Sequence, residues 1–115
     1  MITVSLPRSF AEFERMALPG ALFEIDGTIV ALNAAGAQLL ARPLAEVVGR
    51  KAWEFAPGME HVWHERIASS ASGPRFTIAV ATAHGARVVE YITALCELDG
   101  HRYVVAIVTE AKPLV

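Results

Sequence analysis

The most informative stretch of this chain for its fold is Leu22-Phe-Glu-Ile-Asp-Gly-Thr-Ile-Val-Ala-Leu-Asn33. It contains two runs of β-forming residues, 22–25 and 28–32, which meet at Asp26-Gly27. Asp-Gly between such runs is the strongest short-range hairpin signal, because a type I′ turn needs a positive φ at both central residues. Asn33 directly precedes an Ala-rich helical pattern, and Asn is a preferred N-cap residue. The stretch therefore predicts a tight hairpin that leads directly into a helix.

Composition limits the kinds of protein that this chain can be. Its 115 residues, 54% of them hydrophobic, suffice for one domain with a core of its own and leave no room for a second. A net charge of −2 gives no basic surface for nucleic acid or for a membrane. The single cysteine excludes an internal disulfide framework. With no transmembrane pattern, and with Pro7 and Arg8 where a signal peptide would be apolar, we expect a cytoplasmic protein.

An amphipathic helix is predicted near the N-terminus. Ser9 and Glu12 match the S-x-x-E capping box, so the helix is expected to begin at Ser9. Phe10 and Phe13 fall on one face at helical spacing, and Pro19-Gly20 ends the pattern. This helix presents an apolar face that must be covered by something.

Short helices and then strands follow the hairpin. Helical patterns occupy four segments: 34–40, 44–47, 50–55 and 60–70. After Ser72-Gly73-Pro74 the hydrophobic period changes from about 3.6 to 2, and three β-rich runs follow: 75–82, 87–98 and 102–109. His84-Gly85 and Asp99-Gly100 join these runs by short turns, which predicts an antiparallel meander.

Both faces of the run 87–96 are largely apolar, whereas a sheet with one solvated face should alternate apolar and polar residues. We therefore expect both faces to be covered, one by the helical cluster 34–70 and the other by the N-terminal helix or a second subunit. The fold class is α+β: a five-stranded antiparallel sheet with a cluster of short helices on one face and an N-terminal helix on the other.

This pattern resembles the PAS domain, a sensor and dimerisation module of cytosolic signalling proteins. Four segments carry the resemblance: Phe-Glu-Ile-Asp-Gly-Thr-Ile-Val at 23–30 with Asn33, Leu-Ala-Glu-Val-Val-Gly-Arg at 44–50, the His84-Gly85 turn, and Val-Thr-Glu-Ala-Lys at 108–112. The resemblance implies a PAS-like domain over 20–112, preceded by the N-terminal helix within 1–19, for capping or dimerisation, and followed by a tail, 113–115. Ile107 stands where multidomain members often carry the Asp of an Asp-Ile-Thr run that passes the signal to a downstream helix.

PAS domains hold ligands between the sheet and the central helices, so the resemblance implies a pocket there. By register, the expected lining residues are Asn33, Leu40, Trp53, Trp63, Ile67, Ile78, Ile92 and Val105. The alternative is that these side chains fill a closed core, because small cores are packed without voids.

Two histidines, His61 and His64, lie one turn apart on the predicted helix 60–70. At His64 this chain resembles the oxygen-sensing heme PAS domains of rhizobial type, which carry their proximal histidine at that position. Heme bound through His64 is therefore an alternative function. The distal arginine of those sensors has no clear counterpart in this sequence, Arg75 being the nearest candidate. Glu65 and Arg66 flank His64 as on a solvated face, so an ordinary solvent-exposed histidine is the competing interpretation. No cysteine lies near enough to complete a transition-metal site.

Other chemistry finds less support in the sequence. The light-sensing PAS subclass needs an Asn-Cys-Arg run that this chain does not have, and Cys96 lies in a strand pattern as a small buried hydrophobe, so flavin is not expected. Glu90 lies among apolar neighbours, and on the pocket face it would need a partner, for which Arg75, Arg102 or Lys51 could serve. The alternative is an exposed Glu at the sheet edge. A small acid–base isomerase using Asp26 with His61 or His64 is a further alternative, although Asp26 belongs to a turn.

The sequence thus predicts a sensory and signal-transduction module without catalysis of its own. It is expected to bind a small-molecule ligand, to form a homodimer, or both, and to act on an effector domain or partner protein, with no nucleic-acid or membrane partner. Three aromatic residues are assigned to the dimer interface: Phe10, Phe13 and Tyr91.

Overall fold

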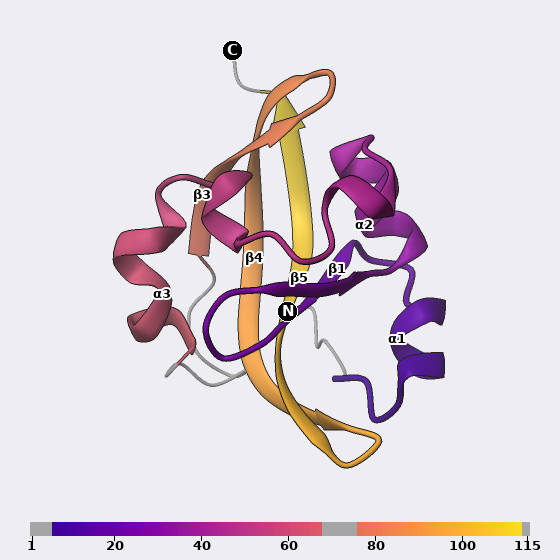
Figure 1. The fold of residues 1–115 in the computed structure, drawn as a ribbon. Coiled ribbons are helices and arrows are strands. Elements are labelled where there is room, and N and C mark those ends of the chain that lie inside the picture. The colour runs from indigo at the N-terminus through magenta and orange to yellow at the C-terminus, as the bar shows by residue number, and fades with distance from the viewer. Residues whose placement is uncertain (1–5, 68–75, 114–115) are drawn as a thin grey trace.

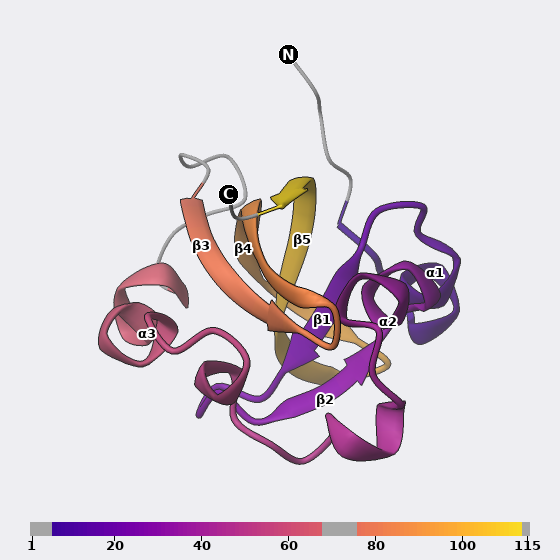
Figure 2. The ribbon, with the colours of Figure 1, turned by 90° about the horizontal axis from the view of Figure 1, so that it is seen from above.

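Five antiparallel strands form a single sheet in the computed structural model, which describes residues 6–67 and 76–113 (Figure 1). The spatial order of the strands is β2-β1-β5-β4-β3. Their bounds are β1 Gly20–Phe23, β2 Ile29–Leu32, β3 Phe76–Thr82, β4 Gly85–Leu98 and β5 His101–Pro113. The predicted meander is therefore confirmed as β3-β4-β5, and the N-terminal hairpin joins it through the pairing of β1 with β5. The sheet is strongly twisted, as the view from above shows (Figure 2).

Helices cover both faces of this sheet. The helices are α1 Phe10–Arg15, α2 Ala34–Leu40 and α3 Met59–Ile67, with two 3₁₀ turns, η1 Leu44–Glu46 and η2 Ala52–Glu54. α2, α3 and the two turns pack on one face around Trp63, and α1 packs on the other around Phe13. This arrangement confirms the predicted α+β fold. No helix within 6–67 or 76–113 is long and apolar enough to cross a membrane.

The opening hairpin forms, but its turn differs from the prediction. The Gly27 N–H donates to the Glu24 carbonyl (2.9 Å) and the Glu24 N–H donates to the Thr28 carbonyl (2.8 Å), so the loop comprises residues 25–27. Only Gly27 has a positive φ (91°), because the Asp26 carboxylate accepts from the Thr28 N–H and forms its own local turn. The type I′ geometry is found instead at Asp99-Gly100, where φ is 51° and 85°.

Several element boundaries also differ from the expected ones. α1 ends at Arg15, since Met16 is already extended. The turn after β3 comprises Ala83 and His84, because Thr82 pairs with Gly85. β5 continues to Pro113, which pairs with Arg87. The expected positions 68–70 of the third helix and Arg75 lie outside the described residues.

Asn33 joins the N-terminal segment, the hairpin and α2. Its Oδ1 accepts from the N–H groups of Gly36 (2.8 Å) and Gly20 (2.9 Å), and its Nδ2 donates to the carbonyls of Leu18 (2.9 Å) and Phe13 (3.3 Å). The predicted N-cap is confirmed by the first of these bonds. The other three fix how the two helical layers meet at the start of β1.

Candidate functional site

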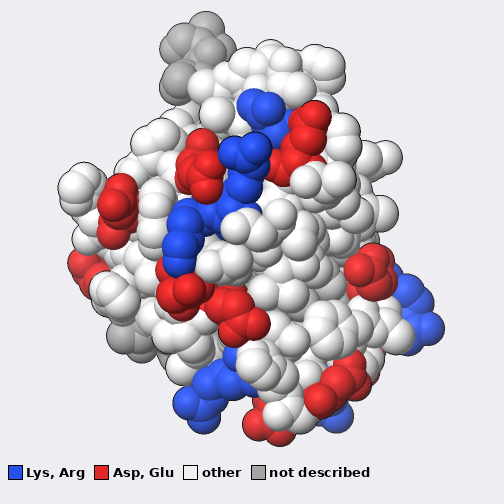
Figure 3. All heavy atoms as spheres, in the orientation of Figure 1, with Lys and Arg blue, Asp and Glu red and all other residues white. Residues whose placement is uncertain are grey.

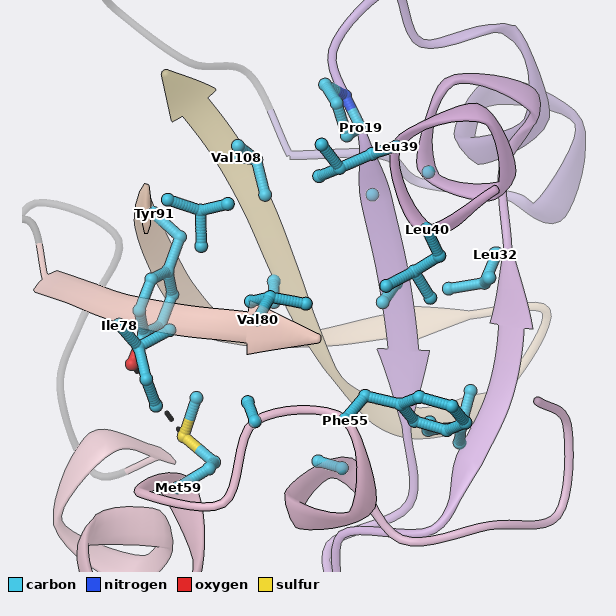
Figure 4. A pocket seen from close by; sticks show the side chains of 18 of the residues that line it. Pro19, Leu32, Leu39, Leu40, Phe55, Met59, Ile78, Val80, Tyr91 and Val108 are labelled. Atoms are coloured by element: carbon cyan, nitrogen blue, oxygen red, sulfur yellow. Dashed lines mark hydrogen bonds between the residues drawn. The ribbon is translucent and has the colours of Figure 1, made fainter. Parts of the chain in front are cut away.

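A cavity of about 110 Å³ lies between the sheet and the helices α2 and α3 (Figure 4). Its walls come from α2, η2, α3 and the strands, and the side chains that line it are almost all apolar. Ten of them are labelled in Figure 4: Pro19, Leu32, Leu39, Leu40, Phe55, Met59, Ile78, Val80, Tyr91 and Val108. Such a lining favours an apolar occupant over water, because water needs polar partners.

A side-chain hydroxyl, that of Tyr91, lies at this cavity (Figure 4). Tyr91 is 2% exposed, and its O–H donates to the Met59 sulfur at 3.7 Å. A thioether is a weak acceptor, so this is a weak hydrogen bond. The cavity thus combines a hydrophobic wall with one buried hydroxyl donor.

The cavity volume indicates the size of molecule that fits. An apolar cavity of about 150 Å³ binds benzene or xenon, while pockets for drug-sized ligands span about 300–1,000 Å³. At about 110 Å³ this cavity is smaller than either, so it suits molecules no larger than benzene.

The residues that sequence analysis assigned to the pocket fall into three groups. Leu40 and Ile78 line the cavity. Trp53, Trp63 and Ile67 belong to the same hydrophobic core but lie behind the lining. Trp63 is held there by a hydrogen bond from its indole N–H to the Ile25 carbonyl at 2.7 Å.

Ile92, Val105 and Asn33 do not line the cavity, which corrects the expectation for them. Ile92 and Val105 pack around Phe13 on the opposite face of the sheet. Asn33 is fully buried, and its amide is committed to the backbone bonds described above. The reason for Ile92 and Val105 is general. When both faces of a strand are apolar, the alternation of residues does not show whether the odd-numbered or the even-numbered side chains face a given helix.

Of the three aromatic residues expected at a dimer interface, Phe13 and Tyr91 are buried within the chain itself and Phe10 is partly buried. Phe13 is completely buried against the sheet, and Phe10 meets the ring of Tyr103 edge-to-face at 5.5 Å. Tyr91 faces the cavity on the other side. The apolar face of the N-terminal helix therefore packs on its own sheet, with Phe10 left partly exposed.

His61 and His64 are both exposed and neither lines the cavity. Among the residues that the structure describes, no three His, Cys, Asp or Glu side chains gather as a metal site would require. A heme iron needs an imidazole directed into a large apolar pocket. The exposed His64 and the small cavity do not fit that group.

Glu90 and Cys96 both have structural roles away from the cavity. Glu90 accepts a hydrogen bond from the Thr109 hydroxyl at 3.2 Å. Cys96 is buried in the core around Phe13, and burial raises the pKa of its thiol. Neither residue lies on the cavity wall.

Asp26 is a turn residue with a strongly stabilised carboxylate. Hydrogen bonds from Thr28 and then from the Lys51 ammonium lower the pKa of Asp26 from 3.8 to about 2. The Lys51 Nζ lies 3.1 Å from Oδ2 and also donates to the Asp26 carbonyl at 2.9 Å. These bonds occupy the carboxylate, and they leave no support for its use as an acid–base partner of His61 or His64.

The lowered pKa of Asp26 predicts a specific pH dependence. A folded-state pKa below the unfolded value contributes stability above the unfolded pKa, and this contribution disappears as the pH falls through the folded pKa. The stability difference between the wild type and Asp26→Asn should therefore shrink as the pH falls from 3.8 to about 2. A carboxyl NMR titration of Asp26 provides the direct measurement, and Lys51→Met should raise its midpoint. An Asp26 midpoint near 3.8 in the wild type would contradict the expectation.

Some cavity residues escaped the sequence analysis. Phe55, Met59 and Ala106 line the cavity, and each comes from a different element. The available signal was the apolar run Phe55-Ala56 before the break at Pro57-Gly58, which places side chains at the junction of η2 and α3. Their convergence depends on how far η2 lies from β5, and local sequence does not specify that distance.

Charges on the surface are mixed. On the face drawn in Figure 3, basic side chains form a band with acidic side chains on both sides. Opposite charges at this spacing neutralise each other at short range.

Comparison with solved structures gives the same fold. The PAS domain of an HTR-like protein from Haloarcula marismortui superimposes with a TM-score of 0.71 and 26% identity, covering 85% of this chain and 90% of that one. A domain of a sensory box sensor histidine kinase/response regulator from Geobacter sulfurreducens gives 0.67 at 20% identity, covering 88% and 90%. The PAS domain of nitrogen regulation protein NR(II) from Vibrio parahaemolyticus gives 0.63 at 10% identity, covering 87% and 94%.

Sequence comparison agrees with the structural one. A search of curated proteins finds no match. The family described as the PAS fold matches residues 13–111, a range that reaches from α1 into all five strands and includes the elements around the cavity. The chain therefore belongs to the PAS fold family, whose members are sensory modules of signalling proteins and are generally not catalytic.

Proposed function

We propose that this PAS domain senses a small apolar molecule, which binds in the cavity between the sheet and the helices. The observation that carries the proposal is the cavity of about 110 Å³ with its apolar lining. Each buried CH₂ group contributes about 0.8 kcal/mol. A ligand of a few carbon atoms therefore gains several kcal/mol on entering.

The position of the cavity offers a way to transmit binding. Leu40 comes from α2, Met59 from α3 and Val108 from β5, so an occupant would contact both the helical layer and the sheet. Packed interiors respond to an added group by shifting elements, because they leave few voids. The proposed output is therefore a change in the spacing of helices and sheet.

The effector of this signal is proposed to be another domain or protein. Two of the solved relatives are named as parts of a sensor histidine kinase/response regulator and of a nitrogen regulation protein. The acidic residues and histidines discussed above are exposed or committed to structural bonds, which supports a sensory role without catalysis.

Benzene is a suitable probe of the cavity, and methyl NMR can report where it binds. Saturating benzene is expected to shift the methyl signals of Leu40 and Ile78, which line the cavity. Ile92 and Val105 lie on the other face and serve as internal controls. Binding to the folded state should also raise the thermal midpoint with benzene concentration.

Matched variants test whether the cavity is the site. Ala106→Leu adds three carbon atoms at the cavity wall and should abolish the benzene-induced shifts. Ala79→Leu makes the same change at an exposed position of β3 and should leave them intact. Equal shifts on both faces, or full binding in Ala106→Leu, would overturn the proposal.

A further inference from the structure

A charged groove shares one residue with the apolar cavity. The groove is bordered by Arg42, Glu46, Arg50, Glu54 and Phe55. Phe55 also lines the cavity, where Figure 4 shows its ring at the η2 side. One aromatic side chain therefore contributes to both the buried site and the surface groove.

Arg42 is fixed on this ring without a carboxylate partner. Its guanidinium carbon lies 5.5 Å from the centroid of Phe55. Its Nε is buried and, within the part of the chain that the structure describes, has no hydrogen-bond acceptor. Stacking on an aromatic ring orients a guanidinium and leaves its N–H groups available in the ring plane. Because a buried N–H without an acceptor is costly, this position favours an added acceptor.

The other charged residues of the groove are arranged differently. Arg50 is paired with Glu54 at 3.1 Å, and Glu54 also accepts from the Lys51 backbone N–H at 2.9 Å. The hydrogen bond from the Lys51 backbone N–H, and after it the bond from the Arg50 side chain, lower the pKa of Glu54. Glu46 is an exposed acidic group at the border of the same groove and would repel an incoming anion. Arg42 is thus the cation of this groove that lacks a carboxylate partner among the described residues.

We propose that Arg42 binds the carboxylate of a ligand whose apolar part occupies the cavity. The ligand class is then a small aromatic or aliphatic monocarboxylate, held by two charge-assisted N–H···O bonds from the guanidinium and by burial of its hydrocarbon part. Guanidinium and carboxylate match in a bidentate geometry. This inference rests on the proposed function, since it assumes that the cavity is a ligand site.

Benzoate and benzamide are matched probes, because they differ mainly in charge at the carboxyl position. Calorimetric titration should show that benzoate binds at least about tenfold more tightly than benzamide, the effect of a charge-assisted hydrogen bond. The preference should fall with added salt, because partly exposed charges are screened. Glu46→Gln should increase benzoate affinity and leave benzamide affinity unchanged.

Substitutions in the groove assign the preference to Arg42. Arg42→Gln should make the two probes bind equally, and Arg42→Lys should restore part of the difference. Arg50→Gln removes a neighbouring exposed arginine and should preserve the difference. Circular dichroism of each variant confirms that the fold is kept.

The outcomes separate this inference from the proposed function. Equal binding of both probes to the wild type, with loss of both in Ala106→Leu, would overturn the role of Arg42 and keep the cavity as a ligand site. Absence of binding by benzene, benzoate and benzamide would overturn both. A benzoate preference that survives Arg42→Gln would assign the carboxylate to another group and overturn the inference.

Discussion

Replacing Asn33 with alanine is expected to lower the free energy of unfolding by about 3–5 kcal/mol, because it leaves several buried backbone groups without partners. The amide bonds the N–H groups of Gly20 and Gly36 and the carbonyls of Phe13 and Leu18. Asn33 itself is completely buried, so water does not replace these bonds. Urea unfolding followed by tryptophan fluorescence measures the loss, which is large against a typical total of about 5–15 kcal/mol.

Two further variants distinguish a local cap from the wider role of Asn33. Asn33→Asp keeps the acceptor atom of an N-cap but directs a carboxylate at the carbonyls of Phe13 and Leu18. It should therefore be destabilised as well. Gln38→Ala removes an exposed amide from the same helix and should change stability by less than about 0.5 kcal/mol. Wild-type stability in Asn33→Asp would show that capping alone matters.

Gly36→Ala is expected to destabilise the domain by about 1–3 kcal/mol, although alanine is the better helix former by about 1 kcal/mol. A Cβ at this position would lie 2.6 Å from the backbone oxygen of Gly20 and 3.2 Å from Oδ1 of Asn33. A backbone atom cannot move aside as a flexible side chain can, so α2 would have to shift away from β1. The same unfolding measurement reports the change.

Gly58→Ala is the matched control for Gly36→Ala. Its Cβ would meet only the Ile78 side chain, at 3.7 Å and beyond, which is ordinary contact. Gly58 also has no positive φ that would strain an alanine. Its stability should therefore stay close to that of the wild type, and a stabilised Gly36→Ala would contradict the close approach of α2 to β1.

Turn residues show how much of the fold could be predicted locally. The hairpin at Asp26-Gly27 was predicted from the two residue types, but the same dipeptide adopts two different turns in this chain. At Asp99-Gly100 both residues have a positive φ, whereas at Asp26 the side chain bonds the Thr28 N–H and Lys51 approaches. The Asp-Gly dipeptide therefore predicts that the chain reverses direction, whereas the contacts around each turn determine its backbone geometry.

The candidate site could be predicted only in outline. A pocket between sheet and helices was expected, and Leu40 and Ile78 line it. Ile92 and Val105 lie on the opposite face from the one predicted. Both faces of β4 and β5 are apolar, so the sequence does not distinguish the side chains of one face from those of the other. Arg42 was not identified at all, since its place above Phe55 depends on how η1 and η2 pack.

The elements, their order and the antiparallel connections follow from the sequence, because periodicity, caps and short turns are local properties of the chain. Three features depend on the packing of the layers: which apolar face meets which helix, that Phe10 and Phe13 pack on the chain's own sheet, and that an apolar cavity remains beside Phe55. Local sequence does not specify them because hydrophobic burial is non-directional. Burial specifies that these side chains leave water, whereas the packing of the assembled layers determines where each one goes and where a space is left.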